Sequence, residues 1–144
     1  LETALRLGPD RLVVGEVRGR EALPLVQALN ARVDGAIVAA TGDSANQVLE
    51  RIATLARAHG ADATAVHELV ATAFELVVHV VRRADGTVKV HSIEEVTGLG
   101  EAGFETQPLF TWTGTAFAPT GAAPRFYAEL DARGIPSNQA IFRA

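Results

Sequence analysis

Two side chains that can do chemistry, Glu16 and Arg18, follow a short apolar run within the segment Leu12-Val13-Val14-Gly15-Glu16-Val17-Arg18-Gly19. Apolar, mostly β-branched residues without polar alternation predict a central parallel strand covered on both faces. Ligands bind at the carboxyl ends of such strands, where an unpaired buried carboxylate would cost several kcal/mol. We therefore predict that Glu16 reaches water, a cation or a reacting group; a plain surface ion pair with Arg18 is the alternative.

The elements that must position this pair alternate between strand and helix. Apolar residues at i, i+3, i+4 and i+7 predict a helix from about Glu21 to Arg32, and a second apolar run predicts a strand over 36–40. Strand, helix, strand and helix follow one another over residues 1–60. This order predicts an α/β fold with a parallel sheet and right-handed crossovers.

Helix ends are also marked in the sequence. Ser44 and Gln47 have the spacing of a capping box, and Gly60 lies where a glycine would end the helix that Ser44 begins. A further helix marked by Val66 and Ala73 should begin at Asp62 or Thr64.

The second half of the chain predicts antiparallel strands that extend the sheet. Asp85-Gly86 separates two strand-like runs and is a strong hairpin signal. A glycine-rich loop is expected over 98–103, and a short helix should be closed by Gly134 and Pro136. The expected strands cover 76–83, 87–96, 106–112 and 116–118, and the last helix covers 126–133.

Composition limits the classes of function. The chain has 144 residues, 48% of them hydrophobic, and a net charge of −4 with Lys89 as its only lysine. A nucleic-acid partner is not expected, because such a partner requires a positive surface. The chain has no cysteine and therefore no disulfide or thiolate metal site, and no apolar run approaches the roughly 20 residues needed to span a bilayer. These features predict a soluble domain in a reducing compartment.

The four histidines favour structural explanations. His59 should lie at a helix C-terminus, where it interacts with the dipole, and His67 should lie on a solvated helix face. His79 and His91 fall on neighbouring hairpin strands and could face each other. Two histidines without a third ligand make a weak case for a metal site.

A longer segment carries a family resemblance. Leu5-Arg6, then Pro9 to Gly19, then Glu21-Ala22-Leu23 and Gln27-Ala28-Leu29-Asn30 resemble the Walker B region of the type II/IV secretion ATPase superfamily. Within it, the segment is similar to the CpaF-like ATPases of Flp/Tad pilus assembly. The resemblance continues through Asp34-Gly35, Ser44-Ala45, the hairpin and the tail over 126–136.

This resemblance implies the C-terminal part of a RecA-like P-loop NTPase domain. Residues 1–60 would hold the Walker B and His-box core, and 61–144 would add a helix, the antiparallel hairpin extension and a short C-terminal helix. The family is hexameric and hydrolyses ATP with Mg²⁺ to drive pilus assembly or protein secretion. The expected location is cytoplasmic and peripheral to the inner membrane, with a pilus or secretion platform protein as partner.

The resemblance also assigns roles to single residues. Glu16 matches the Walker B glutamate, which acts near Mg²⁺ and the attacking water without a direct metal ligand being implied here. Arg18 matches the adjoining arginine, which could bind phosphate or a neighbouring subunit. Arg6 also matches a family position, with a structural pair to Asp10 as the alternative. The positions assigned to nucleotide binding are Arg6, Gly15, Thr41 and Ser44.

This sequence departs from the family pattern in two respects. The glycine-rich phosphate loop with its lysine does not occur in these residues, so we expect it upstream of Leu1 and expect the chain alone to be inactive. Val33 and Thr41 stand where the family usually has the two histidines of its His box. Valine cannot transfer a proton, so a catalytically degenerate, non-hydrolysing subunit is the alternative function.

Overall fold

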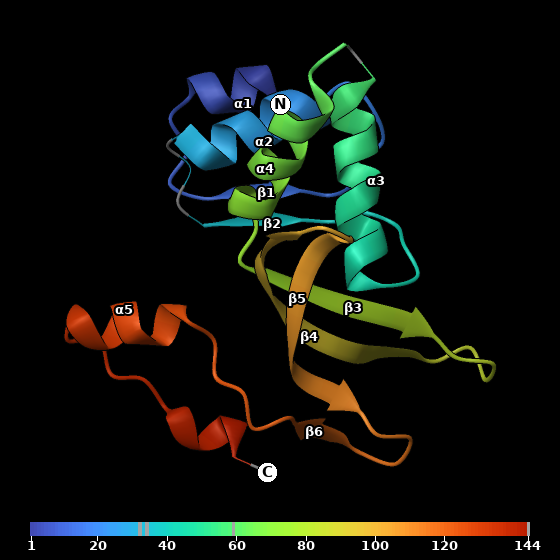
Figure 1. Ribbon diagram of the computed structural model, residues 1–144, viewed down its shortest axis with the longest axis vertical. Coiled ribbons are helices and arrows are strands. Elements are labelled where there is room, and N and C mark those ends of the chain that lie inside the picture. Colours follow the sequence, from blue (N-terminus) through green and yellow to red (C-terminus); the bar gives the residue numbers. More distant parts are fainter. Residues whose placement is uncertain (32, 34, 59, 144) are drawn as a thin grey trace. The chain divides into compact units, whose positions relative to one another are not determined.

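A computed structural model describes residues 1–31, 33, 35–58 and 60–143, which divide into two compact units (Figure 1). Unit 1 consists of Leu1–Glu75 together with Thr97–Glu105, and unit 2 consists of Leu76–Val96 together with Thr106–Ala144. The chain is mixed α/β, as predicted.

Unit 1 carries a parallel pair of strands with helices packed on it. The pair runs in register from Leu12 opposite Ala36 to Val14 opposite Val38, which confirms the predicted parallel sheet. Three helices pack on one another: Ala22–Ala31, Ala45–Arg57 and Ala63–Ala73. The first and last of these, and the helix Glu2–Arg6, lie on the same side of the two strands (Figure 1). Its elements are α1 (Glu2–Arg6), β1 (Leu12–Val14), α2 (Ala22–Ala31), β2 (Ala36–Val38), α3 (Ala45–Arg57) and α4 (Ala63–Ala73).

One face of the β1–β2 pair is open, so the prediction that this strand is covered on both faces was wrong. Leu12 is buried at 6% exposure, whereas Val13 is 73% exposed and its neighbour in register, Ile37, is 72% exposed. Alternate residues of a strand point to opposite faces. The packed helices therefore cover the face of Leu12 and leave Val13 and Ile37 without a cover in the described residues.

The predicted helix ends are confirmed. Ser44 Oγ accepts the Gln47 N–H at 3.2 Å, and Gln47 Oε1 accepts the N–H of Asp43 at 2.6 Å. Asp62, rather than Thr64, caps α4 by accepting the N–H of Ala65 at 2.9 Å. Gly60 follows α3 with a φ of +85°, a conformation that glycine adopts without a steric penalty.

A second sheet contains four antiparallel strands in the order β3-β4-β5-β6. It is a separate sheet, which corrects the prediction that these strands extend the parallel one. The glycine-rich loop is also shorter than expected, because β4 continues through Gly100 and β5 begins at Gly103. The elements are β3 (Leu76–Arg82), β4 (Val88–Gly100), β5 (Gly103–Trp112), β6 (Phe117–Pro119), α5 (Phe126–Ala132) and the 3₁₀ helix η1 (Gln139–Phe142).

An aromatic cluster anchors the C-terminal segment within unit 2. The Phe142 ring centroid lies 5.4 Å from that of Phe110 and 5.1 Å from that of Tyr127. Glu95, buried at 3% exposure, accepts the backbone N–H of Arg125 at 2.8 Å. The predicted hairpin turn between β3 and β4 is confirmed, with Gly86 at a φ of +82°. The 3₁₀ helix η1 was not predicted.

Candidate functional site

Glu16 lies in a loop that leaves the parallel pair just beyond the end of β1. The Ala39 N–H donates to the Val14 carbonyl at 3.0 Å, and the Ala39 carbonyl accepts the Val17 N–H at 2.9 Å. Gly15 and Glu16 lie between these two hydrogen bonds and have no partner of this kind on β2. Val17 is buried at 1% exposure, while Gly15 and Glu16 are exposed. The backbone therefore holds both sides of Glu16 and leaves its side chain exposed.

Glu16 and Arg18 form an ion pair through Oε2 and Nη2, which is the surface ion pair that the sequence predicted as the alternative. The hydrogen bond from Arg18 lowers the pKa of the Glu16 carboxyl, with a smaller contribution from the Arg51 charge on α3. The same pair raises the pKa of Arg18. Both groups are therefore ionised at neutral pH. A carboxylate in this state can accept hydrogen bonds from water or approach a cation.

The loop after β2 lies at the same edge of the sheet, because β1 and β2 are parallel and in register. Thr41 and Ser44 belong to this loop. The Ser44 hydroxyl oxygen caps α3, so its position is explained by helix formation. Gly42 packs against α3: a Cβ there would lie 2.6 Å from Val48 Cγ2. The loop that carries Thr41 is therefore held close to the first turn of the helix.

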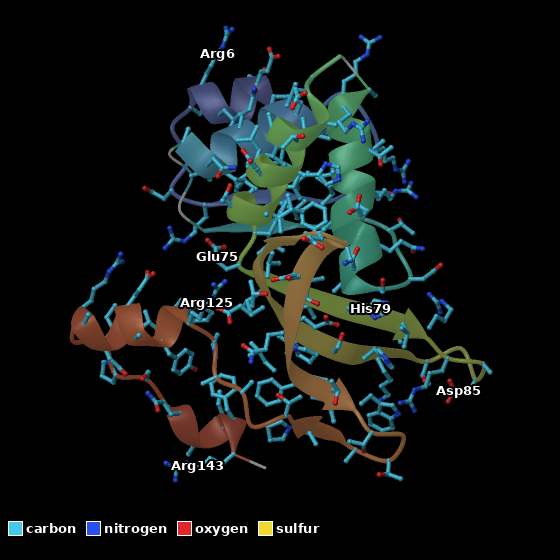
Figure 2. The ribbon with its side chains drawn as sticks, in the orientation of Figure 1. Arg6, Glu75, His79, Asp85, Arg125 and Arg143 are labelled. Carbon is cyan, nitrogen blue, oxygen red and sulfur yellow. The ribbon has the colours of Figure 1, made fainter. Side chains whose placement is uncertain are left out.

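Arg6 lies apart from the Glu16 loop in the chain, at the last turn of α1, where its side chain projects away from the helices (Figure 2). It lines a pocket of about 580 Å³ together with Val33, Asp10 and Arg11. The described residues show no ion pair between Arg6 and Asp10. The structure therefore brings Arg6 to one pocket with Val33, the position where the family pattern has a histidine.

Asn30, which carries part of the family resemblance, links two helices. Its side-chain amide donates to the carbonyls of Val26 on α2 and Leu69 on α4, both at 2.8 Å. Its Oδ1 accepts the Thr72 hydroxyl at 2.7 Å. The residue therefore has a structural role that its sequence position alone did not reveal.

His67 is not on a solvated face, which corrects the prediction for this residue. Its Nδ1 lies 2.8 Å from the Ala63 carbonyl oxygen and its Nε2 lies 3.1 Å from Glu50 Oε2 on α3. Its ring stacks on Phe104 at a centroid distance of 5.4 Å. The Ala63 carbonyl is the main cause that raises the pKa of His67; Glu50 adds to the effect, while partial burial and Arg57 oppose it.

We expect the stability contribution of His67 to depend on pH. A raised pKa in the folded state means that the contribution is fully present below the unfolded pKa of about 6.5 and is lost as pH rises through the folded value. In H67F, which keeps a ring against Phe104, this loss should disappear. The effect should be at most about 1 kcal/mol, as for other ion pairs that are partly solvated.

Urea unfolding of wild type and H67F at pH 5.5 and pH 8.5, followed by far-UV circular dichroism, measures this difference directly. Every other ionisable side chain is the same in both proteins, so the difference between the two proteins isolates His67. An identical change in unfolding free energy with pH in both would contradict the assignment.

The remaining histidines give no metal site in the described part of the chain. The rings of His79 and His91 lie edge-on with centroids 5.5 Å apart, which confirms that they face each other. No group of three or more His, Cys, Asp or Glu side chains that could hold a metal ion occurs among the described residues. The predictions that involve His59, Arg32 and Asp34 fall on residues outside the described part.

In open α/β sheets, ligands bind beyond the carboxyl ends of the strands, which is where Glu16 and Arg18 lie. Comparison with known proteins identifies the family to which the chain belongs. Residues 1–115 match the family model described as "Type II/IV secretion system protein". The chain therefore belongs to the type II/IV secretion system protein family.

Several conjugal transfer proteins are similar to this chain. A putative conjugal transfer protein of Mycobacterium tuberculosis is 34% identical over 109 residues, which is 76% of this chain and 30% of that protein. A probable conjugal transfer protein TrbB of Sinorhizobium fredii is 31% identical over 107 residues, 74% of this chain and 32% of that protein. The chain thus spans about a third of the length of these relatives.

No described helix is both long enough and apolar enough to cross a membrane.

Proposed function

We propose that these residues form the C-terminal part of a RecA-like P-loop domain in a hexameric ATPase that drives protein secretion, pilus assembly of the Flp/Tad kind or conjugal transfer. Family membership and the similarity to conjugal transfer proteins support a secretion-related role. In this proposal the protein lies in the cytoplasm against the inner membrane and acts on a membrane platform protein.

The observation that carries the proposal is the loop at Glu16. Two hydrogen bonds to Ala39 hold its flanks, and its exposed carboxylate, ionised at neutral pH, pairs with Arg18. Phosphoryl transfer depends mainly on positioning and on electrostatic stabilisation of phosphate charge. An ionised carboxylate that orients a water, next to a guanidinium, suits this chemistry.

In this proposal these residues supply part of a Mg²⁺-ATP site, and a different segment supplies the rest. Bound Mg²⁺-ATP would supply the phosphoryl group to be transferred. Glu16 would accept a hydrogen bond from the attacking water, and Arg18 would stabilise negative charge. The sequence has no glycine-rich loop with a lysine, and its only lysine, Lys89, lies on β4 in unit 2. We therefore assign the phosphate cradle to residues outside this chain.

The direct test compares the full-length protein with residues 1–144 alone. We expect the full-length protein to hydrolyse ATP only when Mg²⁺ is present, and residues 1–144 to show no turnover. Phosphate release with and without excess EDTA measures both. Turnover by residues 1–144 alone would overturn the assignment of the phosphate cradle.

A non-hydrolysing structural subunit is a second candidate function. Val33 and Thr41 favour it, because they replace the two histidines of the family pattern and neither side chain can act as a proton-transferring base. Under this alternative the full-length protein binds its partners but shows no Mg²⁺-dependent turnover in any oligomeric state. The same phosphate-release assay therefore separates the two functions.

A further inference from the structure

The far side of the Glu16 loop is held by a side chain that no sequence argument assigned to the site. Glu21 Oε1 accepts the Arg18 N–H at 2.5 Å and the Gly19 N–H at 3.0 Å. The Gly19 carbonyl in turn accepts the N–H of Ala22, the first residue of α2, at 3.0 Å. Both polar backbone groups of Gly19 are therefore used, and Arg18 is tied to the start of the helix.

With these contacts, the backbone on both sides of the Glu16–Arg18 ion pair is held by hydrogen bonds. Ala39 holds Val14 and Val17 on the strand side, and Glu21 holds Arg18 and Gly19 on the helix side. Among the described residues 14–19, the backbones of Gly15 and Glu16 alone form no hydrogen bond with Ala39 or Glu21. The Glu21 carboxylate thus contacts the backbone of Arg18, whose guanidinium contacts Glu16.

The charge of Glu21 suits this task. Hydrogen bonds from the backbone N–H groups, first that of Arg18, lower the pKa of its carboxyl. An ionised carboxylate makes stronger hydrogen bonds than a neutral acceptor, and a negative charge is favourable at the N-terminus of α2. Glutamine at this position would keep the acceptor but lose the charge.

We propose that Glu21 is a positioning residue for the Glu16–Arg18 pair: it fixes the backbone at Arg18 and Gly19 and does not itself touch the nucleotide. The catalytic consequence rests on the proposed function, but the structural consequence does not. Removing the side chain frees two N–H groups and loosens the loop, while α2 and the β1–β2 pair stay folded.

The first test needs no nucleotide. In the chain of residues 1–144, amide hydrogen exchange at Arg18 and Gly19 should accelerate at least about tenfold in E21A, because both lose their acceptor. E21Q should keep most of the protection. E68A, which removes an exposed glutamate on α4, is the matched control and should leave exchange at these amides unchanged. Unchanged exchange in E21A, with the fold intact by circular dichroism, overturns the proposal.

The second test measures ATP hydrolysis by the full-length protein. E21A should lower kcat by about 10- to 100-fold, the usual effect of losing an outer positioning contact, with little change in the KM for ATP. E21Q should recover most of kcat, and E68A should match wild type. Unchanged kcat in E21A overturns the positioning role, as does a raised KM alone.

The two proposals fail in different ways. If the full-length protein shows no turnover, or if E16Q hydrolyses ATP at the wild-type rate, the proposed function fails, and the exchange experiment still decides whether Glu21 holds the loop. If E16Q is inactive and E21A is fully active, only the role of Glu21 is refuted.

Discussion

Replacing Glu16 by glutamine in the full-length protein should lower ATP turnover by roughly 10²- to 10⁴-fold, the usual contribution of a positioned general base. Glutamine has almost the same size and can still accept a hydrogen bond, but it has no charge and cannot take a proton. Because Glu16 is exposed and the backbone bonds to Ala39 do not involve its side chain, the fold should be unaffected. We therefore expect the substitution to slow the hydrolysis step without changing the fold.

Nucleotide affinity separates this result from simple loss of binding. E16Q should bind a fluorescent ATP analogue with Mg²⁺ as tightly as wild type, while phosphate release falls. E68Q, on an exposed position of α4, serves as the matched glutamate-to-glutamine control and should retain wild-type turnover. Wild-type hydrolysis by E16Q would contradict the role given to this carboxylate.

Replacing Leu25 by alanine should destabilise the chain by about 2–5 kcal/mol, the cost of truncating a large buried side chain and leaving a cavity. Leu25 lies on α2 and has 0% exposure. Because α2 packs against both α3 and α4, the loss falls on the centre of unit 1. Urea unfolding followed by far-UV circular dichroism reports on this unit, since most of the residues in its helices and strands are helical.

Leu7→Ala is the matched control, because this leucine follows α1 and is 81% exposed. Its effect on the unfolding free energy should stay within about 0.5 kcal/mol, as for other surface substitutions. An equal loss of stability in the two variants would show that α2 does not form the packed centre described above.

The helices and the parallel strand pair could be predicted because each is specified locally. The capping box at Ser44 and Gln47 needs only four consecutive residues, and so does the cap at Asp62. The apolar run ending at Val14 likewise marks a strand, whatever surrounds it. Local signals of this kind agree with the structure to within a few residues.

What covers a strand could not be predicted from the strand itself. An apolar residue such as Val13 indicates only that burial would be favourable, and the covering element is specified elsewhere in the chain. The same holds for Ile37, its neighbour in register. The extent of β4 was underestimated because Gly98 and Gly100 were interpreted as loop residues. Glycine weakens a strand interior but does occur there, often at a bulge or a close backbone approach.

In the candidate site, too, residues marked by the local sequence could be predicted, while residues whose role depends on the fold could not. Glu16 and Arg18 were singled out as candidates because a carboxylate directly after an apolar run is unusual on energetic grounds. Glu21 was part of the recognised segment, but its role depends on the turn that aims two N–H groups at one oxygen. His67 required knowledge of which helix faces α4. An acidic residue at the start of a predicted helix was the available signal for Glu21.

The two hydrogen bonds of Ala39 have a consequence for how such a protein can change through evolution. They fix the register on either side of position 16 through the backbone alone, so almost any side chain can stand there without unfolding the chain. A family member could therefore lose hydrolysis by a single substitution and still keep its shape. The same backbone geometry would serve an active motor or a silent subunit of the same assembly.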